Sequence, residues 1–179
     1  MGKYLNKKNR AIFLDRDGII NKSKVVKGKP FPPLSLEEFE FNKGIKIFIN
    51  TLDDKKFKKI IITNQPDFER GKTSKKNIED IHAFILKHLS IDEIYTCWDS
   101  HDGVSDLKKP SPGLILKAAK EHNISLKDSY MVGDRWKDID AGSRAGCTTI
   151  FVDYHYDEEL NITPDHVISD IREALKIIN

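Results

Sequence analysis

Residues Tyr130–Thr148 read YMVGDRWKDIDAGSRAGCT, and this stretch determines the fold that the sequence predicts. Its apolar beginning is typical of the end of a buried strand, Gly133 permits a sharp turn, and Asp134 follows where the strand ends. A face of very small side chains comes next, formed by Ala141, Gly142, Ala145 and Gly146. Such a face would let a helix lie close to a sheet and hold Asp134 rigidly. A carboxylate at the end of a strand suits a hard metal ion, but it is also a common helix cap, so a metal site requires partners elsewhere.

The composition fits one globular domain with no obvious macromolecular partner. With 179 residues, 39% of them hydrophobic, the chain can bury one full core, so we expect a single domain over residues 1–179. Its 30 Lys plus Arg and 28 Asp plus Glu give a net charge of +2, which provides no general attraction to nucleic acid or to a membrane. The two cysteines form no CxxC pair, and the start MGKYLNKKNR lacks the apolar run of a signal peptide. We therefore expect a cytoplasmic monomer.

Short apolar runs alternate along the chain with amphipathic stretches. The runs predict buried strands over Arg10–Asp15, Lys58–Thr63, Asp92–Cys97, Ser129–Val132 and Thr148–Val152, with a last strand and helix in His166–Ile178. Helices are expected over Lys43–Lys55 after an Asn42 cap, from Ser74 to about Leu89, and from Ser111–Pro112 to about His122–Asn123. This alternation predicts a Rossmann-like α/β fold of three layers, a parallel sheet with helices on both faces.

Three segments carry weaker expectations. The Lys- and Pro-rich segment Lys22–Ser35 is interpreted as an extended loop without a core, and Leu36–Phe41 as a small extended piece. The helix that Ser74 begins has an apolar face made of Ile78, Ile81, His82, Ile85, Leu86 and Leu89. His82 is therefore expected to be a packed core histidine.

Polar groups follow the predicted strands at equivalent places. They are Asp15 with Asp17, then Thr63, then the pair Lys108–Lys109, then Asp134. In open parallel sheets, ligands bind outside the carboxyl ends of the strands. We therefore expect these groups to form one site.

The chemistry of these groups points to phosphoryl transfer. Residues two apart on an extended chain point the same way, so Asp15 and Asp17 would both face the site and Arg16 would point away. With Asp134 they concentrate negative charge that a cation must balance, and oxygen ligands select Mg²⁺. A lysine and a threonine hydroxyl can then neutralise a phosphate. Asp15 is suited to attack phosphorus and form an aspartyl-phosphate, and Asp17 to act as general acid and then base.

Four motifs in order carry a resemblance to a known family. DRDGIIN, TNQ, KKPSPG and GDRWKDIDAGSRAG are similar to the signature motifs of the haloacid dehalogenase superfamily of aspartate-nucleophile phosphatases, over roughly Arg10 to Ile178. The absence of a large cap insertion resembles the capless branch that contains D-glycero-D-manno-heptose 1,7-bisphosphate 7-phosphatase and histidinol-phosphatase. The expected activity is Mg²⁺-dependent hydrolysis of a small phosphate ester. A sugar phosphate of the heptose pathway is the first choice, and histidinol phosphate is the alternative.

The resemblance also assigns roles to individual residues. It implies Asp15 as nucleophile, Asp17 as acid and base, and Thr63 and Lys109 as phosphoryl-stabilising groups. It implies Mg²⁺ on Asp15, Asp134 and the main-chain carbonyl of Asp17, and we expect Asp138 to support this set from behind. The expected substrate-binding residues are Arg16, Asn21, Asn64, Gln65, Lys108 and Arg135.

One departure from the family concerns zinc. Many members of that branch carry a zinc loop between the third strand and the lysine, with a Cys-x-His pair followed by a Cys-x-Cys pair. Cys97 keeps the first position, but Asp99, Ser105 and Leu107 occupy the other three. A site with one thiolate and a leucine does not fit tetrahedral zinc, so we expect no structural zinc, even with His101 nearby.

Other function classes fit less well. A phospho-accepting receiver domain also gathers acids, a threonine and a lysine at strand ends, but it sets its accepting aspartate after the third strand, which here ends in Thr96–Cys97. A catalytically inactive binding domain has no support, because every expected chemical group is present. A nucleic-acid 3′-phosphatase would share the chemistry, but the charge balance offers no polynucleotide surface.

Overall fold

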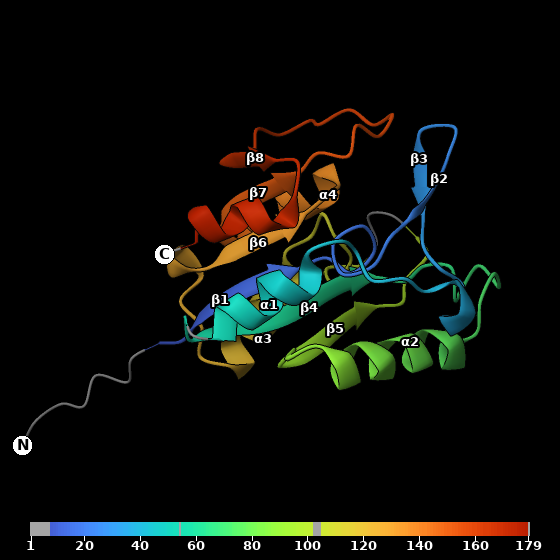
Figure 1. Cartoon of the computed structure of the whole chain (residues 1–179), viewed down its shortest axis with the longest axis horizontal. Coiled ribbons are helices and arrows are strands. Elements are labelled where there is room, and N and C mark those ends of the chain that lie inside the picture. Colours follow the sequence, from blue (N-terminus) through green and yellow to red (C-terminus); the bar gives the residue numbers. More distant parts are fainter. Residues whose placement is uncertain (1–7, 54, 102–104, 179) are drawn as a thin grey trace, which may run out of the picture.

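A six-stranded parallel sheet forms the centre of the protein in a computed structural model, which describes residues 8–53, 55–101 and 105–178 (Figure 1). In spatial order its strands are β5 (Glu93–Cys97), β4 (Phe57–Asn64), β1 (Arg10–Leu14), β6 (Tyr130–Gly133), β7 (Thr148–Val152) and β8 (His166–Ile168). Every neighbouring pair is parallel. The predicted α/β class and parallel sheet are confirmed, and each predicted strand lies within one residue of the observed one.

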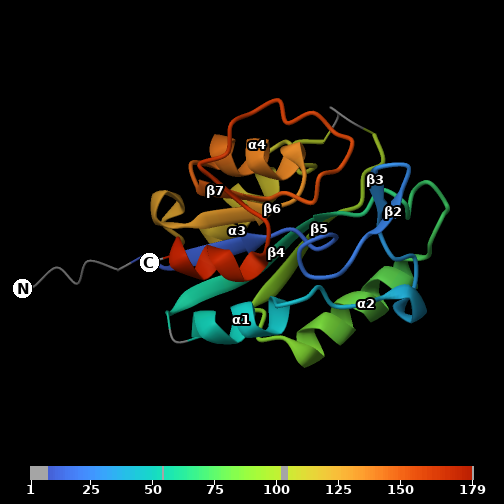
Figure 2. The same ribbon diagram turned by 45° about the horizontal axis from the view of Figure 1, so that its top comes forward.

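Helices cover both faces of this sheet, as Figure 2 shows. One face is covered by α1 (Ile45–Asp53), α2 (Lys75–His88) and the short 3-10 helix η3 (Ile171–Lys176), and the other by α3 (Gly113–Glu121) and α4 (Trp136–Ala145). Strand β1 supplies both cores because its side chains alternate: Ile12 and Leu14 belong to the first, Ala11 and Phe13 to the second. The predicted three layers are therefore present.

Helix α4 lies unusually close to the sheet. A Cβ atom on Gly142 would lie 2.5 Å from the Cβ of Met131 on β6, which real side chains essentially never do. The helix ends at Gly146, whose φ of 87° is the left-handed conformation of a helix C-cap. The predicted face of small residues thus sets the distance between α4 and the strand that carries Asp134.

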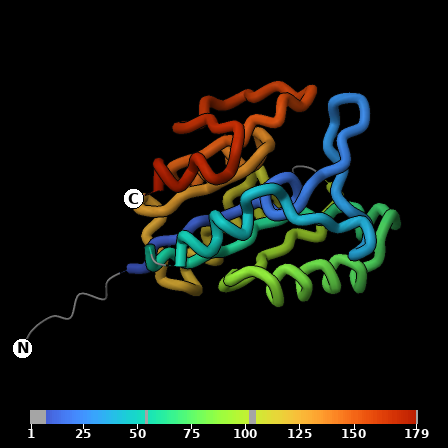
Figure 3. Tube along the Cα trace, in the orientation of Figure 1, coloured from blue at the N-terminus to red at the C-terminus, as the bar shows by residue number. Residues whose placement is uncertain are grey.

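The segment Lys22–Ser35 differs from the loop expected of it. It contains an antiparallel hairpin of β2 (Lys24–Val26) and β3 (Lys29–Phe31), which rises from the body of the protein (Figure 3). Lys27 and Gly28 at its turn both have positive φ, as a two-residue hairpin turn requires. The main-chain N–H of Asp157 donates to the carbonyl of Gly28 at 2.8 Å, so the hairpin turn contacts the segment that follows β7.

Several local expectations are wrong. Leu36–Phe41 contains a 3-10 turn, η1 (Leu36–Glu38), and the last helix is also 3-10. The helix expected over Lys43–Lys55 is shorter, Ile45–Asp53. Leu86 is 47% exposed, because α2 contacts the sheet only through its Ile78, Ile81 and Ile85 side.

Two helix starts gave different outcomes. The hydroxyl of Ser74 accepts a hydrogen bond from the N–H of Asn77, which is the expected N-cap of α2. The hydroxyl of Ser111 instead donates to the carbonyl of Asp106, and α3 begins two residues later at Gly113. A further 3-10 turn, η2 (Leu126–Asp128), precedes β6. Within the part of the chain that the structure describes, no helix is long and apolar enough to cross a membrane.

Candidate active site

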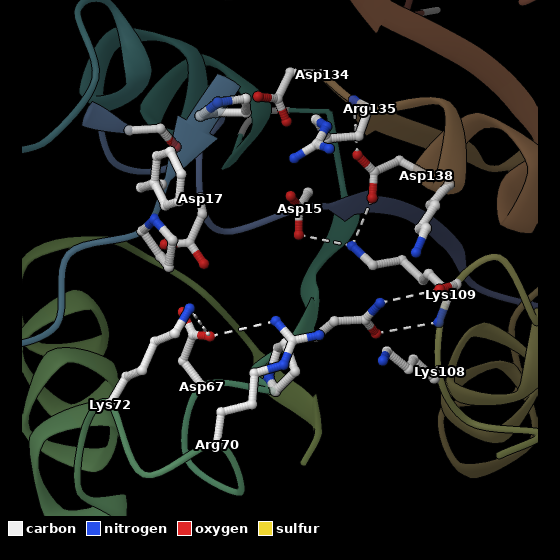
Figure 4. Close-up of a pocket in the computed structure, with 17 residues that line it drawn as sticks. Asp15, Asp17, Asp67, Arg70, Lys72, Lys108, Lys109, Asp134, Arg135 and Asp138 are labelled. Atoms are coloured by element: carbon white, nitrogen blue, oxygen red, sulfur yellow. Dashed lines mark hydrogen bonds and ion pairs between the residues drawn. The ribbon is translucent and has the colours of Figure 1, made fainter. Parts of the chain in front are cut away.

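A pocket of about 290 Å³ lies at the carboxyl ends of the central strands (Figure 4). Most of the predicted site residues meet here. The residues that line the pocket are Asp15, Asp17, Ser23, Pro30, Phe31, Pro32, Asn64, Pro66, Asp67, Arg70, Lys72, Lys108, Lys109, Asp134, Arg135, Lys137 and Asp138. The sheet topology explains this convergence, since β1, β4 and β6 are neighbours and all end at this edge.

Lys109 joins two carboxylates at the floor of the pocket. Its Nζ donates to an oxygen of Asp15 at 2.7 Å and to Oδ1 of Asp138 at 2.6 Å, and all three residues are buried. Burial of the ammonium acts to lower the pKa of Lys109, but Asp138 and Asp15 outweigh it and raise that pKa. Burial and the charge of Asp138 raise the pKa of Asp15 to about 7, although Lys109 opposes the rise. Lys109 is therefore a permanent cation beside the predicted nucleophile.

Asp134 is a buried carboxylate without a partner. It is 1% exposed, and neither of its oxygens has a hydrogen-bond partner among the described residues. Burial, followed by the charges of Asp15 and Asp138, raises the pKa of Asp134 well above its usual value. The nearby Tyr156 hydroxyl lowers the pKa of Asp134 and so offsets this rise only in part. It does not form a hydrogen bond of normal geometry with either Asp134 oxygen. A buried carboxylate in this condition costs free energy unless it is protonated or a cation binds it.

These carboxylates fit a magnesium ion. One carboxylate oxygen each from Asp15, Asp134 and Asp138 lies within 4.8 Å of the other two. Among the described residues, these three form the cluster of side chains that could hold a metal ion. All the donors are oxygens, as Mg²⁺ prefers. Asp138 is already committed to Lys109 and to the main-chain N–H of Arg135 at 3.0 Å. Asp15 and Asp134 are therefore the side chains that would hold the ion, and Asp138 would support them from behind.

Asp17 reaches the pocket with its carboxylate held from behind. Oδ1 accepts hydrogen bonds from Nε and Nη2 of Arg16 at 3.1 and 2.9 Å and from Nδ2 of Asn21 at 3.0 Å. Oδ2 accepts from Nη2 of Arg16 at 3.0 Å and from Nε2 of Gln65 at 2.8 Å. The Asp17 side chain is only 16% exposed. Three of the predicted substrate-binding residues thus hold the Asp17 carboxylate.

The structure does not place the predicted substrate-binding residues Arg16, Asn21 and Gln65 on the wall of the pocket, and their contact with a substrate stays a prediction. Arg16 and Asn21 are fully buried and Gln65 is 3% exposed, and none of them lines the pocket. The guanidinium of Arg16 contacts the Asp17 carboxylate, with Nη2 donating to Oδ1 at 2.9 Å. Asn21 returns to Asp17 because the chain turns after β1, with the N–H groups of Ile20 and Asn21 both donating to the carbonyl of Arg16.

The remaining predicted residues divide between the floor and the rim. Thr63 is fully buried and its hydroxyl accepts from Gln65 at 2.8 Å, so it lies beneath the pocket. Asn64 exchanges two hydrogen bonds of 3.1 Å with the main chain of Lys109 and fixes that residue.

Lys108 lines the rim of the pocket, while its Nζ donates to the carbonyl of Ser100 at 2.8 Å. Arg135 also lines the pocket and forms a bidentate pair with Glu158 at 2.5 and 2.6 Å.

Sequence reasoning missed part of the rim. Asp67, Arg70 and Lys72 follow the TNQ motif and line the pocket, with both cations within 3.4 Å of a carboxylate oxygen of Asp67. Lys137 from the first turn of α4 lines it as well. The available signal was the run of charges directly after a predicted strand end.

Cys97 has a local partner. Its thiol is 2% exposed and donates to Asp99 at 3.6 Å, and burial raises its pKa. The ring of His101 lies 3.2 Å from the hydroxyl of Ser100. Part of the loop, residues 102–104, is outside the described residues, and the expectation that no structural zinc is bound stays a prediction.

Comparisons with known proteins point to one family. The HAD-hydrolase-like family model matches residues 107–174. The D-glycero-beta-D-manno-heptose-1,7-bisphosphate 7-phosphatase of Helicobacter pylori (strain ATCC 700392 / 26695) is 38% identical over 143 residues, which are 76% of this chain and 79% of that protein. The D-glycero-alpha-D-manno-heptose-1,7-bisphosphate 7-phosphatase of Photorhabdus laumondii is 35% identical over 157 residues, 81% of this chain and 82% of that protein.

Solved structures share the fold. A D,D-heptose 1.7-bisphosphate phosphatase from B. bronchiseptica, complexed with magnesium and phosphate, has a TM-score of 0.76 at 22% identity and covers 94% of this chain and 99% of its own. A HAD-like phosphatase from Mesorhizobium loti has a TM-score of 0.76 at 24% identity, over 99% of this chain and 88% of its own.

Proposed function

Because the chain belongs to the haloacid dehalogenase-like phosphatases that include the D-glycero-D-manno-heptose 1,7-bisphosphate 7-phosphatases, we propose that it hydrolyses a sugar bisphosphate of this kind through an aspartyl-phosphate on Asp15. The observation that carries the proposal is the pairing of Asp15 with Lys109 next to the unpartnered carboxylate of Asp134. A carboxylate nucleophile, a neighbouring cation and carboxylate oxygens suited to Mg²⁺, all at one edge of the sheet, are the parts that phosphoryl transfer from a monoester requires.

In the first half-reaction, a carboxylate oxygen of Asp15 attacks phosphorus. The bond between phosphorus and the sugar oxygen breaks, and Asp17 donates a proton to the departing alkoxide. Lys109 stabilises the negative charge on the phosphoryl oxygens, and Asn64 keeps the main chain of Lys109 in register. Magnesium held by Asp15, Asp134 and, as the family resemblance implies, the carbonyl of Asp17 would supply further neutralisation of the phosphate charge.

In the second half-reaction, Asp17 has lost its proton and can act as a base. It takes a proton from a water molecule, which attacks phosphorus of the aspartyl-phosphate. The phosphorus–oxygen bond to Asp15 breaks and inorganic phosphate leaves. The fixed orientation of Asp17 by three neighbours supports both roles, because the same carboxylate must meet the leaving oxygen and then the water.

The rim of the pocket supports a substrate with a second phosphate. Arg70, Lys72, Lys108 and Lys137 all line it, and they come from three separate parts of the chain. Cations at the rim favour a second anionic group beyond the phosphate under attack. They disfavour histidinol phosphate, whose free end is an ammonium ion, so the bisphosphate is the better candidate.

Phosphate release from purified enzyme tests the proposal. Both anomers of D-glycero-D-manno-heptose 1,7-bisphosphate and histidinol phosphate are compared with Mg²⁺ and with EDTA, and ³¹P NMR identifies the phosphate that is lost. We expect loss of the C7 phosphate, dependence on Mg²⁺, and no turnover by Asp15→Asn. A higher kcat/KM for histidinol phosphate would overturn the substrate proposal, and full activity of Asp15→Asn would overturn the mechanism.

Arg70→Ala examines the rim. Its side chain is 45% exposed, so its loss should leave the fold intact. We expect KM for the bisphosphate to rise roughly tenfold, the scale of one charge-assisted contact, and KM for a sugar monophosphate to stay unchanged. Arg144→Ala is the matched control, because Arg144 is 53% exposed and does not line the pocket. An equal rise in KM for both substrates would contradict a subsite for the second phosphate.

A further inference from the structure

His82 in helix α2 contacts Arg16, the residue that holds the carboxylate of the acid/base Asp17. Nη1 of Arg16 lies 3.1 Å from Nε2 of His82 in α2. We infer that His82 is a positioning residue for Asp17, acting through the guanidinium of Arg16. This inference deepens the proposed function and rests on the role of Asp17 there.

The direction of this hydrogen bond follows from the chemistry of the two groups. Arginine has only donors and stays charged, so Nε2 of His82 must present its lone pair and the ring proton must be on Nδ1. Burial, together with the charge of Arg16, lowers the pKa of His82 to about 3. The ring is therefore a neutral acceptor across the range in which the enzyme would work.

The guanidinium of Arg16 is held on each of its nitrogen atoms. Nη1 faces His82, Nη2 donates to Gln65 at 3.0 Å and to Asp17, and Nε donates to Asp17. Arg16 is fully buried, so no water can replace a lost acceptor on Nη1 without rearrangement. Removal of His82 would let the planar group rotate, and the two oxygens of Asp17 would move with it.

His82 is placed by the fold and has no route to a substrate. His82 lies on the same side of α2 as Ile78, Ile81 and Ile85, the buried side of the helix. It does not line the pocket. The ring contact is therefore set by helix packing. The expectation of a packed core histidine is right about the face of the helix, but it misses that a buried cation needs this acceptor.

A leaving-group comparison separates positioning of an acid from a general loss of structure. A sugar phosphate needs a proton on its departing alkoxide, whereas p-nitrophenyl phosphate releases a stable phenolate without one. General acid catalysis supplies about 10²–10⁴-fold in rate. We expect His82→Leu to lower kcat/KM for the sugar phosphate roughly tenfold or more, and to lower kcat/KM for p-nitrophenyl phosphate less than about threefold. KM should change little.

Three further variants complete the experiment. His82→Gln retains an acceptor at this position and should recover most of the sugar phosphate activity. His82→Met provides a second variant without a nitrogen acceptor if the Leu variant does not fold, and His88→Leu, on the exposed side of the same helix, is the control. Equal losses on both substrates, no loss in either variant, or no recovery by Gln would overturn the inference.

Asp17→Asn separates this inference from the proposed function. It should lose sugar phosphate activity far more than p-nitrophenyl phosphate activity in kcat/KM. If it does not, the proposed role of Asp17 fails and the inference fails with it. If Asp17→Asn behaves as expected and the His82 variants match wild type, only the role of His82 is wrong.

Discussion

Gly18 lies directly against Asp134, so that a Cβ atom on Gly18 would be 1.9 Å from Oδ2 of that carboxylate. Gly18 also has a φ of 97°, in the left-handed region that side chains rarely adopt. The turn after β1 and the end of β6 therefore meet without a side chain between them. This contact is what brings Asp134 within reach of Asp15, and it explains why glycine follows the DRD sequence.

Gly18→Ala should displace Asp134 and weaken magnesium binding. We expect the Mg²⁺ concentration for half-maximal activity to rise about tenfold or more, the scale seen when a metal ligand loses its support. A magnesium titration of phosphate release measures this. Gly146→Ala is the control, because its φ of 87° gives similar backbone strain while open space surrounds its Cβ position. An equal effect of both variants on magnesium affinity would show that strain alone is responsible.

Lys109→Met should remove both activity and stability. Asp15 and Asp138 would lose a cation at 2.7 and 2.6 Å, and breaking a buried pair costs about 3–5 kcal/mol. Loss of phosphoryl stabilisation should lower kcat by about 10²-fold or more. Urea denaturation and steady-state kinetics measure the two effects.

Lys59→Met is the control for this variant. Lys59 is 4% exposed and pairs with Asp53. It lies near the beginning of β4, whereas the pocket lies at the end of that strand. It should lose stability and keep its kcat. A kcat loss comparable to that of Lys109→Met would mean that the catalytic defect reports unfolding only.

The metal-free protein should become less stable as the pH rises from 5 to 8. The folded-state pKa of Asp15 is about 7 against an ordinary 3.8, and that of Asp134 is raised too. A carboxyl group that binds its proton more tightly in the folded state stabilises the fold fully when the pH is below 3.8, its unfolded-state pKa. This stabilisation is lost as the pH rises through the folded-state pKa of about 7. Urea denaturation in EDTA measures the trend.

Asp134→Asn is the comparison for this trend, because its amide carries no charge. Its unfolding free energy should depend less on pH between 5 and 8. Mg²⁺ should stabilise wild type most at pH 8, where the carboxylates are ionised, and stabilise the variant much less. If the unfolding free energies of the two proteins changed with pH in the same way, the raised folded-state pKa of Asp134 would be refuted.

Gly142→Ala should destabilise the protein although alanine favours helices by about 1 kcal/mol. The new methyl group would lie 2.5 Å from the Cβ of Met131, an atom attached to the strand backbone that cannot turn away. Overpacking costs about 1–3 kcal/mol, so it should outweigh the helix preference. Thermal denaturation measures the shift, and Ser143→Ala on the exposed side of α4 should be neutral or slightly stabilising.

The strands and the residues at their ends could be predicted because buried apolar runs and parallel topology are encoded locally. Asp15, Lys109 and Asp134 follow from that pattern. The β2–β3 hairpin could not be predicted, since its strands are largely exposed and its Lys27–Gly28 turn lacks the usual Asn or Asp.

The direction of long side chains was the other limit. Arg16 and Gln65 follow strand ends and so resemble pocket residues, but both turn inward to Asp17. Whether such groups face a ligand or another side chain depends on the turn after β1, which returns Asn21 to the same carboxylate. Periodicity does not describe such a turn.

The predicted nucleophile follows a fully enclosed strand of the sheet. Strand β1 has β4 on one side and β6 on the other, and its residues Ala11 to Leu14 are completely inaccessible to solvent. Backbone amides in such a strand exchange with deuterium only when the whole domain opens. Asp15 therefore has no low-energy route to local fraying, and enzyme activity should disappear in denaturant along the same transition as the fold itself.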